Sequence, residues 1–241
     1  MAEAGRQDPP AGAAPEPGPA QPRRERRMRA DAVRNREAVL TAAREAFAED
    51  GLEAPLEQIA RRAGVGIGTL YRRFPAREQL IAAALMDKIS QYAEIAEQAV
   101  HEPDPWTGFA GFVERICAMQ ADDRGLADLL LITLAPCEQI EAIRARANRS
   151  VIALMERAKA AGQLRSQLAG EDLLMLFLAT SAIAAATRRD APGALPRFVA
   201  LMLDAFRPQP AGDLPGAPTK AQMTRVMRRL ADAHGCGEPQ A

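Results

Sequence analysis

The sequence of 241 residues has few of the side chains from which most catalytic and metal centres are built. It contains two histidines and three cysteines, and no two cysteines share a CxxC spacing. A GxSxG turn, a phosphate-binding glycine loop, an HExxH helix and a carboxylate pair at catalytic spacing are also missing. We therefore predict that the chain is not an enzyme, and that it needs neither a metal nor a cofactor.

Net charge and long apolar runs are missing as well. Lys+Arg and Asp+Glu both number 31, so the formal net charge is +0 and any nucleic-acid partner must be recognised through a local cluster. No run approaches the roughly 18 apolar residues of a membrane span, and the first residues lack the apolar core of a signal peptide. Isolated cysteines fit a reducing compartment. We expect a cytoplasmic protein with no membrane partner.

Helix formers dominate what is present. Alanine, leucine, arginine and glutamate are frequent and β-branched runs are scarce, which favours an all-α fold. Apolar residues recur at helical spacing from residue 31, and Gly51 ends that first helix. The pattern predicts two short helices over 55–63 and 67–74 and a long fourth helix that opens after Pro75. Further helices are expected over 106–121, 124–134, 137–161, 170–189 and 194–206.

The two ends of the chain differ in composition from its middle. The first 22 residues are rich in proline and small residues, and the next seven include five arginines. We predict that 1–30 is a disordered basic arm, which either adds phosphate contacts to a DNA-binding module or is a solvated tail. Residues 208–241 again contain proline and glycine, and are expected to form a flexible tail with one short amphipathic helix.

The two short helices, joined by a glycine turn and braced by the helix in front, form a helix-turn-helix. In this motif the second short helix enters the major groove of DNA and the first crosses the backbone. Five arginines and no acid lie between residues 61 and 77. Such a local positive charge is typical of nucleic-acid binding, although the whole chain is neutral.

The run from Ile59 to Phe74, IARRAGVGIGTLYRRF, is followed by Arg77-Glu78-x-Leu80. Together they resemble the DNA-binding signature of the TetR/AcrR family of transcriptional regulators. The resemblance implies a three-helix DNA-binding domain over 33–92, with its helix-turn-helix at 55–74. A long helix would join it to a helical ligand-binding and dimerisation domain over 93–207.

The resemblance also implies roles for single residues. Tyr71 looks like the tyrosine that contacts phosphate, Thr69 like the residue that reaches a base edge, and Gly68 like the glycine that permits close approach to DNA. The alternative for Tyr71 is a half-buried core tyrosine. The DNA-binding residues that we predict are Arg61, Gly66, Gly68, Thr69, Tyr71, Arg72, Arg73 and Arg77.

Several positions depart from the family pattern. Ala54 and Pro55 stand where a Ser or Thr usually begins the second helix, and Gly66 replaces a common serine in the turn. Arg73 stands where a histidine is frequent, and Arg77 takes the place of a lysine that shares a phosphate with the start of the fourth helix. We expect fewer hydroxyl contacts and more arginine contacts, and therefore a steep dependence of binding on salt.

The C-terminal half resembles the family in the number, order and length of its helices. A ligand cavity among these helices is implied by the resemblance, whereas a packed core explains the same apolar spacing. The predicted pocket residues are Trp106, Phe109, Phe112, Cys117, Met119, Met155 and Phe177. The helix over 170–189 is apolar almost all round, so it and the next helix are expected at a dimer interface, the alternative being an intramolecular core. The predicted interface residues are Leu174, Phe177, Ser181, Leu195, Phe198, Val199 and Met202.

These features predict a DNA-binding transcriptional regulator. The expected partners are a palindromic double-stranded DNA operator, a second copy of the chain and a small-molecule effector that releases a repressor from its operator. The bound protein would be associated with the nucleoid. The alternatives are an activator of the same fold, and a helical adaptor or enzyme without DNA binding.

Overall fold

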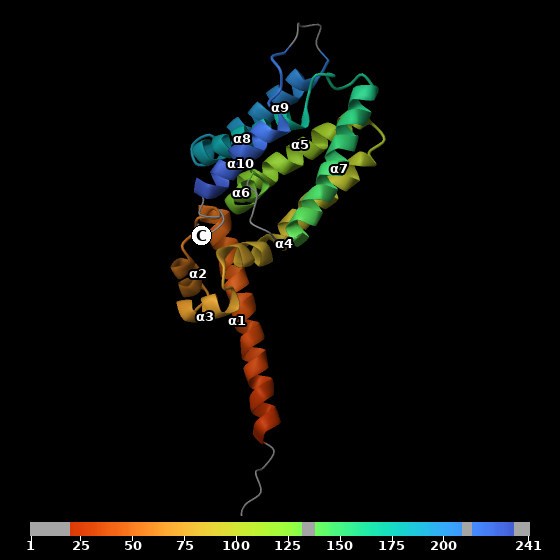
Figure 1. The fold of residues 1–241 in the computed structure, drawn as a ribbon. Helices are drawn as coiled ribbons and strands as arrows, with labels where there is room; N and C mark the ends of the chain where they lie inside the picture. Colours follow the sequence, from red (N-terminus) through yellow and green to blue (C-terminus); the bar gives the residue numbers. More distant parts are fainter. Residues whose placement is uncertain (1–19, 132–137, 209–213, 234–241) are drawn as a thin grey trace, which may run out of the picture.

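The computed structural model describes residues 20–131, 138–208 and 214–233, and within these ranges the chain forms helices and no strands (Figure 1). The predicted all-α fold is confirmed. The helices are α1 (Ala20–Asp50), α2 (Leu56–Arg62), α3 (Ile67–Arg73), α4 (Arg77–Val100), α5 (Pro105–Asp122), α6 (Arg124–Leu131), α7 (Glu138–Ala160), α8 (Gly170–Thr187), α9 (Ala194–Phe206) and α10 (Lys220–Ala233).

The N-terminal unit is built on one face of α1, against which α2 and α4 pack. Phe47 on α1, Ile59 on α2 and Leu70 on α3 are each 0% exposed and meet in one core. Helices α2 and α3 have only 7 residues each, so their stability comes from this shared apolar face rather than from intrinsic propensity. The core fixes how α2 and α3 lie beneath the rest of the molecule (Figure 1).

The start of α1 corrects one prediction. Residues 20–30 were expected to be disordered with the rest of 1–30, but α1 already begins at Ala20. Pro22 is compatible with a first helical turn, because the backbone N–H that proline lacks has no partner there. Arginine, glutamate, methionine and alanine follow it, and all of them favour a helix. The remainder of the predicted arm, 1–19, lies outside the described residues.

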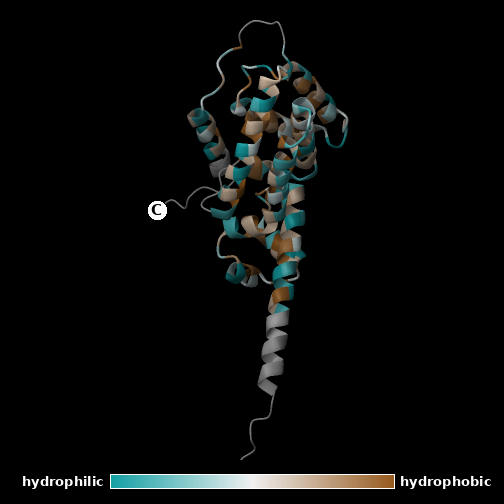
Figure 2. Cartoon of the chain, turned by 90° about the vertical axis from the view of Figure 1, so that its right-hand side faces the viewer, coloured by the Kyte–Doolittle hydropathy of each residue, from teal (hydrophilic) through white to brown (hydrophobic). Residues whose placement is uncertain are grey.

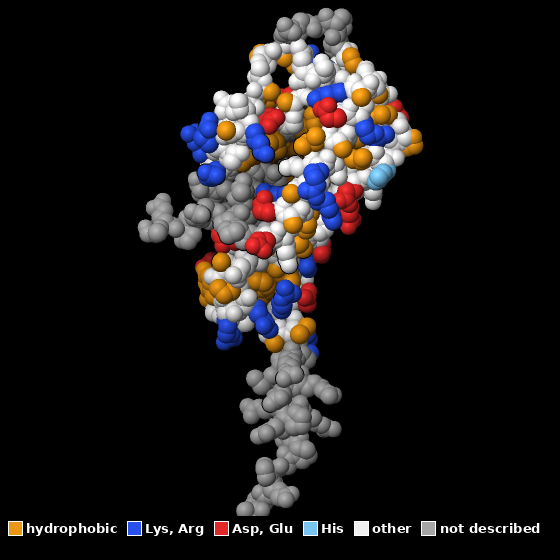
Figure 3. Space-filling view, turned by 45° about the vertical axis from the view of Figure 1, so that its right-hand side comes forward, with side chains coloured by type: hydrophobic (Ala, Val, Ile, Leu, Met, Phe, Trp, Pro, Cys, Tyr) orange, Lys and Arg blue, Asp and Glu red, His pale blue; other side chains and the backbone are white. Residues whose placement is uncertain are grey.

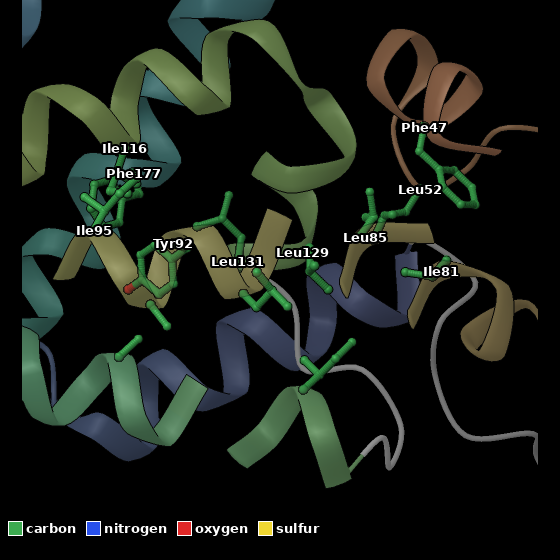
Figure 4. Close-up of a cluster of buried hydrophobic side chains, with 14 of the residues drawn as sticks. Phe47, Leu52, Ile81, Leu85, Tyr92, Ile95, Ile116, Leu129, Leu131 and Phe177 are labelled. Carbon is green, nitrogen blue, oxygen red and sulfur yellow. The ribbon is translucent and has the colours of Figure 1, made fainter. Parts of the chain in front are cut away.

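The C-terminal unit is a helical bundle around α5, which contacts α4, α7, α8 and α9. Aromatic rings connect its layers: the ring centroids of Tyr92 and Phe112 are 6.1 Å apart, and those of Phe112 and Phe177 are 6.4 Å apart. Figure 4 shows Tyr92, Ile95, Ile116 and Phe177 gathered in this core. Helix α4 belongs to both units, since it packs against α1 and along α7.

Helix α6 joins the two units from the other side, because it packs against α1. Gly125 permits this approach: a Cβ on it would lie 2.8 Å from the Cβ of Phe47. Lys88 on α4 adds an ion pair of 3.5 Å with the buried carboxylate of Asp123, just before α6. The N-terminal unit therefore packs against α6 as well as against α4.

The C-terminal tail contains the short helix that the sequence predicted. Helix α10 lies along one side of the bundle (Figure 2). Met223 and Met227 are 6% and 7% exposed and belong to the same core as the rest of the bundle. The tail thus contributes to the packed domain.

Candidate DNA-binding surface and groove

The helix-turn-helix is formed by α2, a tight turn and α3. Gly64 in the turn has φ +67°, a left-handed conformation that glycine adopts without strain. The N–H of Val65 donates to the carbonyl of Ala60 at 3.0 Å and closes the turn onto α2. Pro55 and Gly66 precede the two helices, and neither makes a side-chain cap hydrogen bond. This agrees with the absence of Ser and Thr at these positions.

The outward face of α3 carries most of the residues predicted to contact DNA. Gly66, Gly68, Arg72 and Arg73 are exposed, and Thr69 is partly buried. Tyr71 is 46% exposed and lies outside the apolar core cluster, and its phosphate contact stays a prediction. Figure 3 shows basic side chains gathered at the end of the molecule that α2 and α3 form.

Gly66 and Gly68 leave room on this face. A Cβ at either position would have no heavy atom within 4 Å, so the protein's own packing does not require glycine there. An absent side chain on an exposed recognition helix lets another molecule approach the backbone closely. This geometry is what a helix needs when it enters a DNA groove.

The arginines of the basic cluster divide into two groups. Arg62 pairs with Glu49 on α1 at 2.6 Å, and this hydrogen bond lowers the pKa of the Glu49 carboxyl. Half-buried Arg77 donates to the carbonyls of Leu52 and Ala54, and so fastens the loop between α1 and α2. Both side chains stabilise the N-terminal unit. A phosphate contact by Arg77 stays a prediction.

The remaining arginines are more available to a partner. Arg72 lies 3.5 Å from the hydroxyl of Thr69, and Arg73 donates to the carbonyl of Ala32 at 3.0 Å. Arg61 is exposed, and no ion pair to it is found in the part of the chain that the structure describes. All three arginines are exposed to solvent.

The predicted ligand pocket is mostly packed core. Phe109, Phe112 and Met155 are 0%, 1% and 3% exposed and belong to one apolar cluster. The alternative of a packed core therefore describes these three residues. Met119 is partly buried against the same cluster. Buried Cys117 lines a separate small cleft beside α9. Of the predicted set, only Phe177 lines the larger groove described below.

Trp106 lies at the end of the bundle where α5 begins. Its ring is 5.9 Å from that of Phe109, and the guanidinium of Arg207 stacks 3.9 Å from its centroid. Its backbone N–H donates to Gln163 at 3.1 Å. The tryptophan thus joins the start of α5 to the end of α9, and these contacts assign it a packing role.

A groove of about 350 Å³ opens between α4, α6, α7, α8 and α10. Its apolar wall includes Leu131, Leu174, Phe177, Met223 and Met227. Its polar residues include Tyr92, Glu141, Arg144, Asn148, Glu171 and Lys220. The volume lies in the range of small-molecule sites.

Sequence reasoning missed most of this groove. A signal for it was present in α7, where Arg144 stands at a position of the buried stripe formed by Ile140, Ala147 and Val151. A charged residue on such a stripe requires a partner or a polar cavity. No comparable signal marks Met223 and Met227, because the tail's place on the bundle is a tertiary contact.

Three of the predicted dimer-interface residues are buried in the protomer itself. Phe177, Leu195 and Val199 are 4%, 7% and 4% exposed, and their place at an interface stays a prediction. Since α8 is apolar all round, its periodicity could not show which side faces inward. Leu174, Ser181, Phe198 and Met202 are partly buried, and their place at an interface stays a prediction.

A different apolar face of α8 and α9 points outward. Met175 on α8 is 40% exposed and Leu201 on α9 is 53% exposed. By length and composition α8 could cross a membrane, and 28% of it is buried within the chain, yet it packs against α5 and α9 as part of the bundle. These two helices leave apolar surface that the protomer does not cover.

Family models match both units. The model described as bacterial regulatory proteins of the tetR family matches residues 39–84. The model described as the C-terminal domain of SbtR-like transcriptional regulators matches residues 104–208. The chain belongs to the TetR family. Its members are regulators that act on DNA, and the predicted family resemblance is confirmed.

Individual relatives agree with this assignment. The chain is 34% identical to the TetR transcriptional regulator SCO0520 from Streptomyces coelicolor, over 72% of this chain and 99% of that one, with a TM-score of 0.45. An HlyIIR mutant protein shares the fold alone, at 15% identity and a TM-score of 0.54 over 75% of this chain and 100% of that one.

A shorter match connects the chain to a curated relative. It is 36% identical over 75 residues to the HTH-type transcriptional regulator SAB2452 of Staphylococcus aureus. The match covers 29% of this chain and 40% of that protein, so the chain spans less than half of the relative's length. Helix α10 lies beyond both family models, the second of which ends at residue 208.

Proposed function

We propose that the chain is a cytoplasmic, homodimeric repressor that binds a palindromic operator through α2 and α3 and is released by a small-molecule effector. The observation that carries the DNA contact is the outward face of α3. It combines an exposed tyrosine, two glycines with open space above them and two exposed arginines. Each of these features suits close approach to a phosphate backbone and to base edges.

The outward apolar face of α8 and α9 supports the homodimer. Met175 and Leu201 are large apolar residues without cover, and a second copy of the same face would bury them. A twofold dimer then presents two copies of α3 to successive major grooves, about 34–36 Å apart. This spacing is the reason to expect a palindromic operator.

Effector release requires a structural connection between the two units. Helices α4 and α6 supply it, because each contacts both the N-terminal unit and the bundle. An effector can shift the protein away from its DNA-binding form only by binding the other form more tightly. The bound ligand would therefore change how α4 and α6 hold α1 to α3.

The DNA contact is tested by fluorescence anisotropy with the DNA upstream of the chain's own gene, over a range of salt concentrations. Arg72→Ala is expected to weaken binding and to reduce the slope of log K against log salt by about 0.9. Arg149→Ala is the matched control, because Arg149 is exposed on α7 and is remote from the helix-turn-helix. Equal effects of the two variants, or failure of the chain to bind any operator at moderate salt, would refute the proposal.

The dimer is tested by sedimentation equilibrium of Met175→Glu and Leu201→Glu, each of which would bury charges at the interface. Both variants are expected to be monomeric and to bind operator more weakly. A variant that stays dimeric, with unchanged operator affinity, would show that this face is not the interface. A reporter gene behind the operator gives the sign of regulation: deletion of the chain's gene raises expression if it is a repressor and lowers it if it is an activator.

A further inference from the structure

Helix α10 closes one side of the groove with very few attachments. Met223 and Met227 are its buried side chains among the described residues, while Val226 between them is 38% exposed. Its hydrogen bonds in the described range, such as those between Thr219 and Gln222, stay within the tail itself. Methionine is flexible and adapts its shape to a neighbour. The helix is thus a wall that can adjust to a ligand.

The inner end of the groove carries a positive charge that the protein compensates weakly. The Arg144 side chain is 17% exposed and donates to the carbonyl of Leu129. Its nearest carboxylate belongs to Glu141, which is 3.7 Å away and itself 49% exposed. Burial lowers the pKa of Arg144, since desolvation outweighs the attraction of Glu141. A guanidinium has five N–H donors, so several remain available to an anion.

A hydroxyl donor lies in the same groove. Tyr92 is 9% exposed and lines the groove together with Arg144, and none of the described residues forms a hydrogen bond with its hydroxyl. Burial raises the pKa of Tyr92 to about 12, so the hydroxyl keeps its proton at neutral pH. A hydroxyl that lines a groove without a protein partner can donate to a ligand that accepts a hydrogen bond.

The remaining charges lie at the rim. Glu141 and Lys220 are exposed and Glu171 is partly exposed, so water screens them more than it screens Arg144. Leu131, Leu174, Phe177 and the two methionines of α10 form the apolar part of the groove. The groove therefore combines a deep cation and a hydroxyl donor with an apolar wall.

We propose that this groove binds an amphipathic organic anion, whose acidic group contacts Arg144 and Tyr92 and whose apolar part packs beneath Met223 and Met227. A carboxylate and a sulfonate share the required chemistry. The identification of this ligand with the effector rests on the proposed function, whereas the binding site itself does not. Helix α10 then acts as the cover of the bound ligand, beyond the part of the chain that the family models match.

Two fluorescent probes with the same aromatic frame test the acidic group. Anilinonaphthalene sulfonate carries a sulfonate, and phenylnaphthylamine is its neutral counterpart. Both are titrated into the full chain without DNA, and the sulfonate is expected to bind at least about tenfold more tightly, as charge-assisted hydrogen bonds predict. Decanoate is expected to displace the sulfonate probe, and decanol is not. Equal affinities of the two probes, or equal displacement by decanol, would overturn the proposal without any variant.

Variants then locate the site. Arg144→Met is expected to weaken the sulfonate probe by about tenfold and to leave the neutral probe unchanged. Arg149→Met on the same helix is the control, and equal effects of the two variants would contradict the site. If Arg144→Met does not fold, Arg144→Lys keeps a cation there and should still prefer the sulfonate. Met223→Ser with Met227→Ser is expected to weaken both probes, and unchanged binding of both would exclude α10 as the cover.

The same titrations separate this inference from the proposed function. A chain that prefers the sulfonate but never leaves its operator when decanoate is added has the site without the effector role. A chain that binds operator but does not distinguish the two probes keeps the regulatory function and refutes the anion site.

Discussion

The backbone N–H of Leu52 donates a hydrogen bond of 3.0 Å to a carboxylate oxygen of Asp128. Leu52 belongs to the loop between α1 and α2, and Asp128 belongs to α6. The preceding Gly51 has φ +80°, and a Cβ on it would lie 2.5 Å from the same carboxylate. The loop thus approaches α6 more closely than any other residue at position 51 would allow.

Removal of this carboxylate is expected to destabilise the protein. Leu52 is 0% exposed, so Asp128→Ala leaves a buried N–H without an acceptor, at a cost of about 1–3 kcal/mol. Asp128→Asn is the control, because its amide oxygen can still accept the hydrogen bond. Urea denaturation gives the free energies of unfolding, and equal stability of the alanine variant and the wild type would contradict this account.

Gly68→Ala is expected to weaken operator binding without loss of stability. A Cβ at position 68 meets no atom of the protein, and alanine favours the helix by roughly 0.5–1 kcal/mol, so the melting temperature should hold or rise. The added methyl group instead occupies the face that approaches DNA. Gly111→Ala on α5 has equally open space and should raise stability with no effect on operator affinity. Unchanged operator affinity in Gly68→Ala would remove this glycine from the interface.

Asp104 is expected to make stability depend on acid pH. Hydrogen bonds from Thr107 and Gln163 lower the pKa of this carboxyl from 3.8 to about 2. Because the pKa is lower in the folded state, the carboxylate stabilises the protein above pH 3.8, and this contribution disappears as the pH falls towards about 2. Asp104→Asn still caps α5 but cannot titrate. The difference in unfolding free energy between wild type and variant should therefore shrink between these pH values, and a constant difference would be evidence against the shift.

Cys117 is expected to be chemically inert in the folded protein. It is 2% exposed, and burial raises the pKa of its thiol to about 11. At pH 8 the thiolate fraction is then on the order of one in a thousand, and it is the thiolate that reacts. Iodoacetamide should label the peptide that carries Cys117 slowly in buffer and rapidly in urea, as read by mass spectrometry. Rapid labelling in buffer would show that this thiol is accessible.

The sequence was sufficient to predict the N-terminal unit. Its apolar positions, such as Phe47 and Leu70, repeat at helical spacing, and glycines mark both of its turns. Local sequence patterns determine such short helices. The motif from Ile59 to Phe74 also resembles a family in which these helices bind DNA. The side chains of α3 therefore lie on the face that the sequence assigned to them.

The bundle was harder to predict in detail, and α8 shows why. Its residues are apolar on every side, so composition indicated burial but not whether Phe177 faced its own chain or a second one. The position of α10 depends on residues far apart in the sequence, such as Met223 and Tyr92, which line the same groove. Periodicity in one helix contains no information about its neighbour.

Leu52 has one further property, which involves both of its backbone groups. Its N–H is bonded to Asp128 on α6, while its carbonyl accepts from Arg77 at the start of α4. If α4 and α6 move together, both bonds survive and the loop moves with them as one body. If the two helices move apart, one bond must break. This single residue therefore responds to the difference in position between two helices rather than to the displacement of either one.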